Sequence, residues 1–184
     1  MIKQVPWYKN KKFLVSLMGI FIIGLMVLSS LNIFKEENSN KKIEYKNHIF
    51  YKQENQWITY INDKPVSFFN NPYDVENITI PEFNFMLSKL YIAYDPADIE
   101  NMGFAVNRLM AVLAYFSVRP VLSCYNETDC PDIPIIDCSK DESIYVKYSN
   151  DTKIYINDKC LVLEGAADSQ LKYLDKIFYN LLEV

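Results

Sequence analysis

The longest apolar segment of the chain runs from Phe13 to Phe34, which is 22 residues without a charged side chain. A helix of that length spans the roughly 30 Å hydrocarbon core of a bilayer. Four lysines precede it, at positions 3, 9, 11 and 12, and the positive-inside rule places such residues in the cytoplasm. The pattern therefore predicts a cytoplasmic basic tail over residues 1–12, a single transmembrane helix over residues 13–34, and export of the rest of the chain.

A cleaved signal peptide is the alternative interpretation of the same segment. Its apolar run exceeds the about 7 to 15 residues usual for a signal core, and no A-x-A cleavage site follows. The small residues Ser29 and Ser30 still permit cleavage. Both interpretations place the domain outside the cell.

Residues 35–42 (KEENSNKK) are polar and mixed in charge, which is typical of a juxtamembrane spacer without fixed structure. The pattern changes to strands from Ile43, and residues 43–184 form the predicted exported domain. Apolar, β-branched and aromatic residues gather at 49–51, 57–61 and 66–69, and polar residues separate these runs. Short breaks of this kind, including Asn62-Asp63, favour hairpins, so the segment predicts a β-meander.

The next strong pattern is a strand over residues 89–94 that ends at Asp95-Pro96. Asp95 suits the N-cap of a helix, Pro96 its first position, and Asp98 the place of a capping-box acid. Apolar residues then recur at helical spacing, at Ile99, Met102, Val106, Leu109, Met110, Leu113 and Phe116. A strand resumes over 121–124, so the segment predicts a βαβ unit with parallel strands.

Four further short strands are predicted at 133–137, 144–148, 153–156 and 160–163, and the last three are interpreted as a second meander. A final helix over 166–182 places one apolar face toward the sheet, formed by Leu171, Leu174, Ile177, Phe178, Leu181 and Leu182. The expected fold is therefore an α/β (α+β) domain in which two amphipathic helices pack on a mixed sheet.

All four cysteines lie in the predicted exported part, where an oxidising environment favours disulfides. Cys124 and Cys130 flank a short polar loop, whereas Cys138 follows one predicted strand and Cys160 begins another. Pairing within these two sets needs the least distortion, so we expect Cys124–Cys130 and Cys138–Cys160. A redox dithiol or a zinc site is the alternative, although both usually use closer cysteine pairs.

Composition limits the partners of the exported part. Four of the 19 basic residues precede the apolar segment and all 23 acidic residues follow it, which leaves 15 basic against 23 acidic residues and a net charge of −8. Nucleic-acid binding needs clustered Lys and Arg, so this charge argues against it. With half of its residues hydrophobic, the chain suits one ordinary domain with a core.

Candidate chemistry is sparse. His48 is the only histidine and has no catalytic signature around it, and the four glycines form no phosphate-binding loop, so no catalytic residue and no cofactor is predicted. The carboxyl ends of the parallel strands bring together Asp95, Asp98, Cys124 and Asn126, with Asp129 and Asp132 nearby. Asp95 and Asp98 are weak candidates for holding Mg²⁺ or Ca²⁺, because helix capping already explains both.

Three glycosylation sequons, at Asn77, Asn126 and Asn150, fall in predicted loops of the exported part. The 14 tyrosines and 11 phenylalanines are typical of strand cores and cross-strand pairs, although a binding face is the alternative.

Several segments together resemble a known pattern: the N-terminal anchor, Asp95-Pro96 after a strand, Pro134–Cys138, Thr152–Tyr155, and Cys160–Gly165 before a terminal helix. In this combination, which covers about residues 44 to 184, the chain resembles small single-pass archaeal surface proteins. The resemblance implies export and disulfides, and it transfers no catalytic residue.

The leading hypothesis is a membrane-anchored, extracellular, non-catalytic domain that binds or scaffolds another membrane or cell-surface protein, with the lipid bilayer as its other partner. An exported, metal-assisted enzyme with its site at Asp95, Asp98 and Cys124 is the alternative. A thiol oxidoreductase is a third possibility, and it requires an accessible, easily reduced disulfide.

Overall fold

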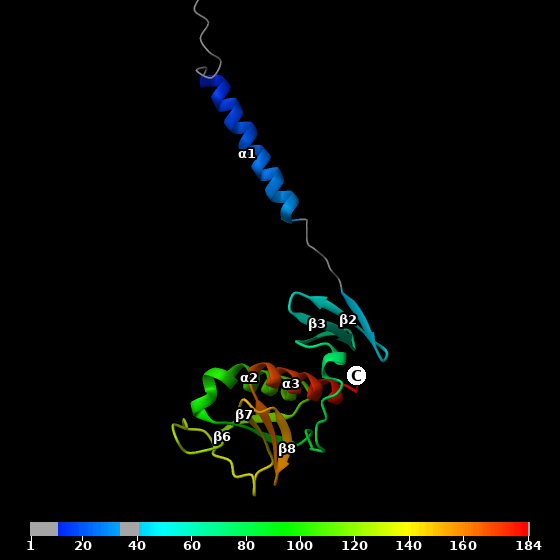
Figure 1. Cartoon of the computed structure of the whole chain (residues 1–184), viewed down its shortest axis with the longest axis vertical. Coiled ribbons are helices and arrows are strands. Elements are labelled where there is room, and N and C mark those ends of the chain that lie inside the picture. The colour runs from blue at the N-terminus through cyan, green and yellow to red at the C-terminus, as the bar shows by residue number, and fades with distance from the viewer. Residues whose placement is uncertain (1–10, 34–40, 184) are drawn as a thin grey trace, which may run out of the picture. The chain divides into compact units, whose positions relative to one another are not determined.

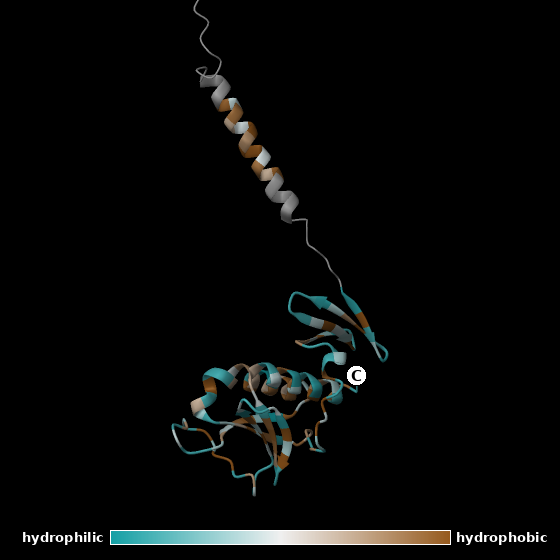
Figure 2. Ribbon diagram, viewed as in Figure 1, coloured by the Kyte–Doolittle hydropathy of each residue, from teal (hydrophilic) through white to brown (hydrophobic). Residues whose placement is uncertain are grey.

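The computed structural model describes residues 11–33 and 41–183, and it divides the chain into two compact units, one up to Asn40 and one from Lys41 (Figure 1). In the first unit, helix α1 covers Lys11–Ile33, so the helix expected from Phe13 is present and begins two residues earlier. Figure 2 shows apolar residues along much of α1. Among the residues that the structure describes, we find no helix with both the length and the apolarity that crossing a membrane requires. The predicted tail up to residue 10, Phe34 and spacer residues 35–40 lie outside the described residues.

The second unit begins with a four-stranded antiparallel sheet in the order β1-β2-β3-β4, which confirms the predicted meander. Its strands are β1 (Lys42–Tyr45), β2 (His48–Gln53), β3 (Gln56–Ile61) and β4 (Lys64–Phe68). The expectation that residues 35–42 lack fixed structure is wrong at its end, because Lys42 pairs with Tyr51 and the Lys41 carbonyl accepts the N–H of Lys52 at 2.9 Å. Asn62 and Asp63 both have positive φ, as a two-residue hairpin turn requires.

A second sheet has five strands in the order β6-β5-β7-β9-β8. They are β5 (Lys89–Tyr94), β6 (Arg119–Cys124), β7 (Ser143–Tyr148), β8 (Lys153–Asn157) and β9 (Cys160–Gly165). Helix α2 (Ile99–Tyr115) connects β5 to β6, and these strands are parallel, which confirms the predicted βαβ unit. The single mixed sheet expected from the sequence is therefore two separate sheets.

The second predicted meander is right for the hairpin of its last two strands and wrong for its first strand. β7 pairs in parallel with both β5 and β9, and β8 pairs with β9 alone as an antiparallel edge strand. The predicted strand at 133–137 is also wrong, since Ile135 forms only an isolated parallel bridge to Cys124. Pro134 lies inside that segment and has no N–H to donate, so the ladder cannot be extended from this bridge toward the start of the segment.

Helices α2 and α3 (Ala167–Leu181) form a layer between the two sheets (Figure 1). The main core lies between these helices and the five-stranded sheet, and it includes Leu90, Ile92, Leu109, Ile144 and Leu174. A second core joins the small sheet to the other side of the helices, through Phe50, Trp57, Val66, Phe68, Val112 and Phe178. Among its buried residues, α3 contributes Phe178 and Tyr179 to this second core and α2 contributes Val112. Ile99, which was expected on the buried face of α2, is instead 42% exposed.

Candidate functional site

The predicted rim lies where β5 and β6 end, and the structure brings Asp95, Asp98 and Asn126 together there. One carboxylate oxygen of Asp95 accepts the N–H of Ala97 at 3.0 Å, and the other accepts the Asn126 side-chain amide at 2.6 Å. Asp98 makes no capping hydrogen bond, and burial, followed by the charge of Asp95, raises its pKa. Both oxygens of Asp95 are therefore used in holding the start of the helix and the loop after β6.

Among the described residues, no three His, Cys, Asp or Glu side chains are gathered in a way that could hold a metal ion. Asp129 and Asp132 are exposed on the loop that follows Asn126. His48 is half-buried at the start of β2, in the other sheet. The geometry therefore gives no specific support to metal-assisted chemistry at the rim.

The structure contains the disulfides Cys124–Cys130 and Cys138–Cys160, which is the pairing expected from the sequence. Cys124, Cys138 and Cys160 are all buried. Thiol exchange requires an accessible sulfur at the site of attack. These positions suit structural crosslinks better than a redox centre.

The three sequons differ in their surroundings. Asn77 and Asn150 are exposed. Asn126 is half-buried, because its side chain donates to Asp95 and also accepts the N–H of Thr128 at 3.0 Å. Attachment of a sugar at Asn126 requires this contact to open.

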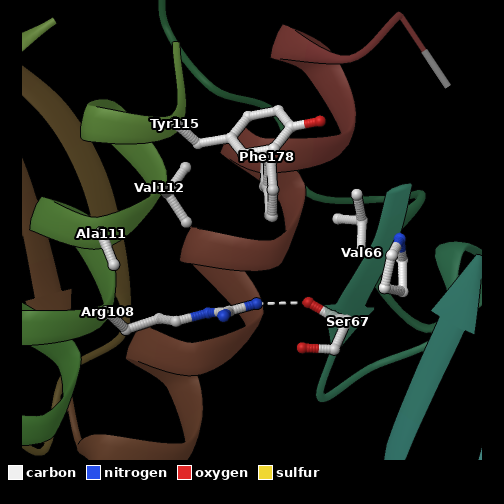
Figure 3. Close-up of a pocket in the computed structure, with 8 residues that line it drawn as sticks. Val66, Ser67, Arg108, Ala111, Val112, Tyr115 and Phe178 are labelled. Atoms are coloured by element: carbon white, nitrogen blue, oxygen red, sulfur yellow. Dashed lines mark hydrogen bonds between the residues drawn. The ribbon is translucent and has the colours of Figure 1, made fainter. Parts of the chain in front are cut away.

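A different location has the geometry of a binding site, and it lies between the edge of the small sheet and the helices (Figure 3). This pocket, which we call the β4 groove, encloses about 170 Å³. Its lining residues are Pro65, Val66, Ser67, Arg108, Ala111, Val112, Tyr115 and Phe178. Val66, Val112 and Phe178 are buried and form an apolar floor, whereas Pro65, Ala111 and Tyr115 are exposed at the rim.

Strand β4 is an edge strand of its sheet, and the hairpin before it fixes which backbone groups face the groove. Ile61 and Lys64 close the two-residue turn and form a hydrogen-bonded pair. Hydrogen-bonded and non-hydrogen-bonded pairs alternate along an antiparallel ladder. Pro65 and Ser67 therefore form non-hydrogen-bonded pairs with β3. The Pro65 carbonyl and the N–H and carbonyl of Ser67 are thus directed away from β3 and toward the groove.

Arg108 closes one end of the β4 groove. Its guanidinium extends from α2 and donates to the Ser67 carbonyl, while Tyr115 lies at the other end (Figure 3). The guanidinium carbon also lies 5.6 Å from the ring centre of Phe69 and 5.7 Å from that of Phe178. This end of the groove is therefore both aromatic and cationic.

The charge of Arg108 is incompletely compensated. Arg108 forms no ion pair within residues 41–183, and its buried Nε has no hydrogen-bond partner there. Burial lowers the pKa of Arg108, and the charge of Asp175 opposes that shift. The Asp175 carboxylate, however, accepts hydrogen bonds from the backbone of Phe69 and Asn70. The groove therefore contains a cation that can accept a further anionic partner.

Sequence reasoning missed the β4 groove. The available signals were an arginine inside the apolar pattern of a helix and the Asn62-Asp63 turn that determines the orientation of β4. Neither signal shows that the helix and the strand edge lie side by side. Comparisons of the chain with protein-family models, with curated proteins and with solved structures give no match.

Proposed function

We propose that this chain is a single-pass membrane protein, with a cytoplasmic N-terminus, whose extracellular domain binds another cell-envelope protein and catalyses no reaction. The observation that carries the proposal is the β4 groove, where an unpaired strand edge, an apolar floor and the Arg108 cation converge. These are the elements with which a protein surface recognises an extended polypeptide.

Sequence alone supports the anchor and the export. The uncharged run from Phe13 to Phe34 and the lysines before it match a membrane helix with its start in the cytoplasm. The two disulfides agree with an oxidising exterior.

The size of the groove favours a polypeptide over a small molecule. Sites for drug-sized ligands usually enclose about 300 to 1,000 Å³, whereas the β4 groove encloses about 170 Å³. That volume suits one side chain of a bound segment. At the rim of the larger sheet, by contrast, Asp95 is already used in capping and Cys124 in a disulfide.

Crosslinking in intact cells tests the binding role. We would replace Ala111, at the exposed rim of the groove, with the photoreactive residue p-benzoylphenylalanine, and make the same replacement at Glu54, an exposed residue in the turn between β2 and β3. Irradiation is expected to give a discrete crosslinked species from position 111 and none from position 54. Equal crosslinking from both positions, or none from either, contradicts the proposal.

Protease treatment tests the orientation. A protease added to intact cells is expected to digest the domain from Lys41 onward and to leave an N-terminal fragment in the membrane. Protection of the domain until lysis rules out an extracellular location.

A further inference from the structure

We propose that the β4 groove binds the free C-terminus of its partner, as an extended strand parallel to β4 with an apolar penultimate residue and the terminal carboxylate at Arg108. This inference rests on the proposed binding function and specifies the chemistry of the partner.

The direction of the bound strand follows from the backbone groups that β4 presents. In an antiparallel ladder, one residue of the edge strand supplies both its N–H and its carbonyl to one partner residue. Pro65 has no N–H, and the Ser67 carbonyl already accepts Arg108. Pro65 therefore cannot complete an antiparallel pair, and at Ser67 the incoming N–H would have to share the carbonyl with the guanidinium.

A parallel strand uses different groups. Consider the residue of the bound strand that lies opposite Val66. Its N–H donates to the carbonyl of the residue before Val66, and its carbonyl accepts the N–H of the residue after Val66. These two groups are the Pro65 carbonyl and the Ser67 N–H, which both face the groove. A parallel partner can thus be bonded through both groups of one residue.

Arg108 determines where the bound segment ends. In a continued parallel ladder, the N–H two residues further along the partner would donate to the Ser67 carbonyl, and it would meet there the guanidinium that already donates to this oxygen. Phe104 packs against Phe69, with ring centres 5.5 Å apart, and Arg108 reaches Ser67, so α2 runs antiparallel to β4. A partner running parallel to β4 therefore reaches Arg108 with its C-terminal end, and a carboxylate there forms a charge-assisted hydrogen bond.

The side chain of the paired residue determines specificity. Residues that lie opposite each other in a sheet point to the same face, and Val66 is buried on the face toward Val112 and Phe178. The paired residue directs its side chain onto this apolar floor. Because the carboxylate at Arg108 belongs to the following residue, the apolar side chain occupies the penultimate position of the partner.

The test uses the full-length chain in detergent and a library of random heptapeptides displayed with free C-termini. Enriched sequences are then synthesised with a terminal carboxylate or a terminal carboxamide, and their affinities are measured by fluorescence anisotropy. We expect an apolar penultimate residue and at least tenfold weaker binding of the carboxamides. A failure to enrich any sequence, or equal binding of both forms, overturns the inference.

Two variants locate the binding site without replacing Arg108 or Ser67. Ala111→Glu places a negative charge at the exposed rim of the groove and is expected to weaken binding at least tenfold. Ala114→Glu makes the same change on the same helix at an exposed position that does not line the groove, and it is expected to leave affinity unchanged. Equal affinities of these variants also overturn the inference.

The outcome separates this inference from the function on which it rests. Crosslinking from position 111 without selection of C-terminal peptides rejects the C-terminal partner and leaves the binding role intact. Absence of both results rejects both proposals.

Discussion

Asp175 is a buried carboxylate, 1% exposed, that fixes the chain immediately after β4 to helix α3. One of its oxygens accepts the N–H groups of Phe69 at 2.9 Å and Asn70 at 2.7 Å, and also the Asn70 side-chain amide at 2.9 Å. Burial raises the pKa of Asp175 from 3.8 to about 6, because desolvation outweighs these hydrogen bonds. The folded protein therefore binds a proton at Asp175 more tightly than the unfolded chain does.

The raised pKa of Asp175 makes the free energy of unfolding depend on pH, and Asp175→Asn should remove this dependence. An acid whose pKa is raised by folding contributes stability below its unfolded pKa, and the contribution is lost as pH rises through about 6. Two pKa units correspond to about 3 kcal/mol. We expect the free energy of unfolding of the variant, relative to the natural chain, to increase by up to about 3 kcal/mol between pH 4 and pH 7, as measured by urea denaturation.

Asp132→Asn provides the control, because it removes one negative charge from an exposed position. A relative stability of Asp175→Asn that stays constant from pH 4 to pH 7 would contradict the expected role of burial.

Neither Asp175 nor Arg108 could be assigned from the sequence. A charged residue on an amphipathic helix usually faces water, and both residues were left out of the predicted helix faces. Their contacts join positions that are 106 residues apart for Asp175 and Phe69 and 41 apart for Arg108 and Ser67. Only the packing of the small sheet on the helices creates these contacts.

At the scale of elements, the start of the βαβ helix was largely predictable. Asp95 caps a short 3₁₀ turn, η3 (Pro96–Asp98), from which α2 continues. The order of strands in the five-stranded sheet was not predictable in the same way. Turn residues indicate which consecutive strands form a hairpin, but they do not indicate beside which strand of the sheet a parallel strand is placed. β7 accordingly joins β5 and β9, while the β8–β9 hairpin follows its local turn signal.

The two aspartates at this helix start should differ in their contribution to stability. Asp95→Ala removes the cap to Ala97 and the acceptor of Asn126, so it should lower the free energy of unfolding by about 1 to 2 kcal/mol. Asp98→Ala removes no capping bond and should cost less than about 0.5 kcal/mol. Urea denaturation followed by circular dichroism measures both. Equal losses would show that the cap is not the source of stability.

The disulfides should also differ, because they close loops of different length. Cys138 and Cys160 are 22 residues apart, whereas Cys124 and Cys130 are 6 apart. Loop entropy gives about 3 kcal/mol for the longer loop and about 2 kcal/mol for the shorter one. Cys138 and Cys160 also pack in the cluster that contains Tyr145 and Val162.

Replacing each cysteine pair with two alanines tests this order. We expect the larger loss of unfolding free energy for the Cys138–Cys160 pair, measured by guanidinium denaturation of the oxidised proteins. A larger loss for the Cys124–Cys130 pair would indicate that the loop after β6 contributes more to stability than its length predicts.

At the scale of the whole molecule, the second unit consists of a helix layer covered on both sides by sheets (Figure 1). The sequence pattern predicted one buried face for each helix. The second face depends on a few residues, such as Val112 and Tyr179, that pack against Phe50 and Phe68 of the small sheet. Such scattered positions do not form a stripe with helical periodicity, so the pattern cannot distinguish two layers from three.

All three hydrophobic clusters of this unit lie within residues 43–182. A chain that starts at Lys41 should therefore unfold with the same free energy as the full-length chain. A chain that starts at Asn47 loses β1, the hydrogen bond from the Tyr73 hydroxyl to the Glu44 carbonyl, and the packing of Tyr45 on Tyr73. The hydrogen bond and the aromatic pair alone contribute about 1 to 3 kcal/mol, and the lost pairing of β1 with β2 adds to this cost.

Guanidinium denaturation of the three chains in the same detergent makes the comparison, with tryptophan fluorescence as the signal because Trp57 is buried in the small sheet. The Asn47 chain should also bind groove peptides more weakly, since β4 is held through β3 and β2 to the strand that has been removed. Equal stability of the Lys41 and Asn47 chains would mean that β1 adds nothing to the small sheet. The β4 edge would then depend on Arg108 and Asp175 for its position.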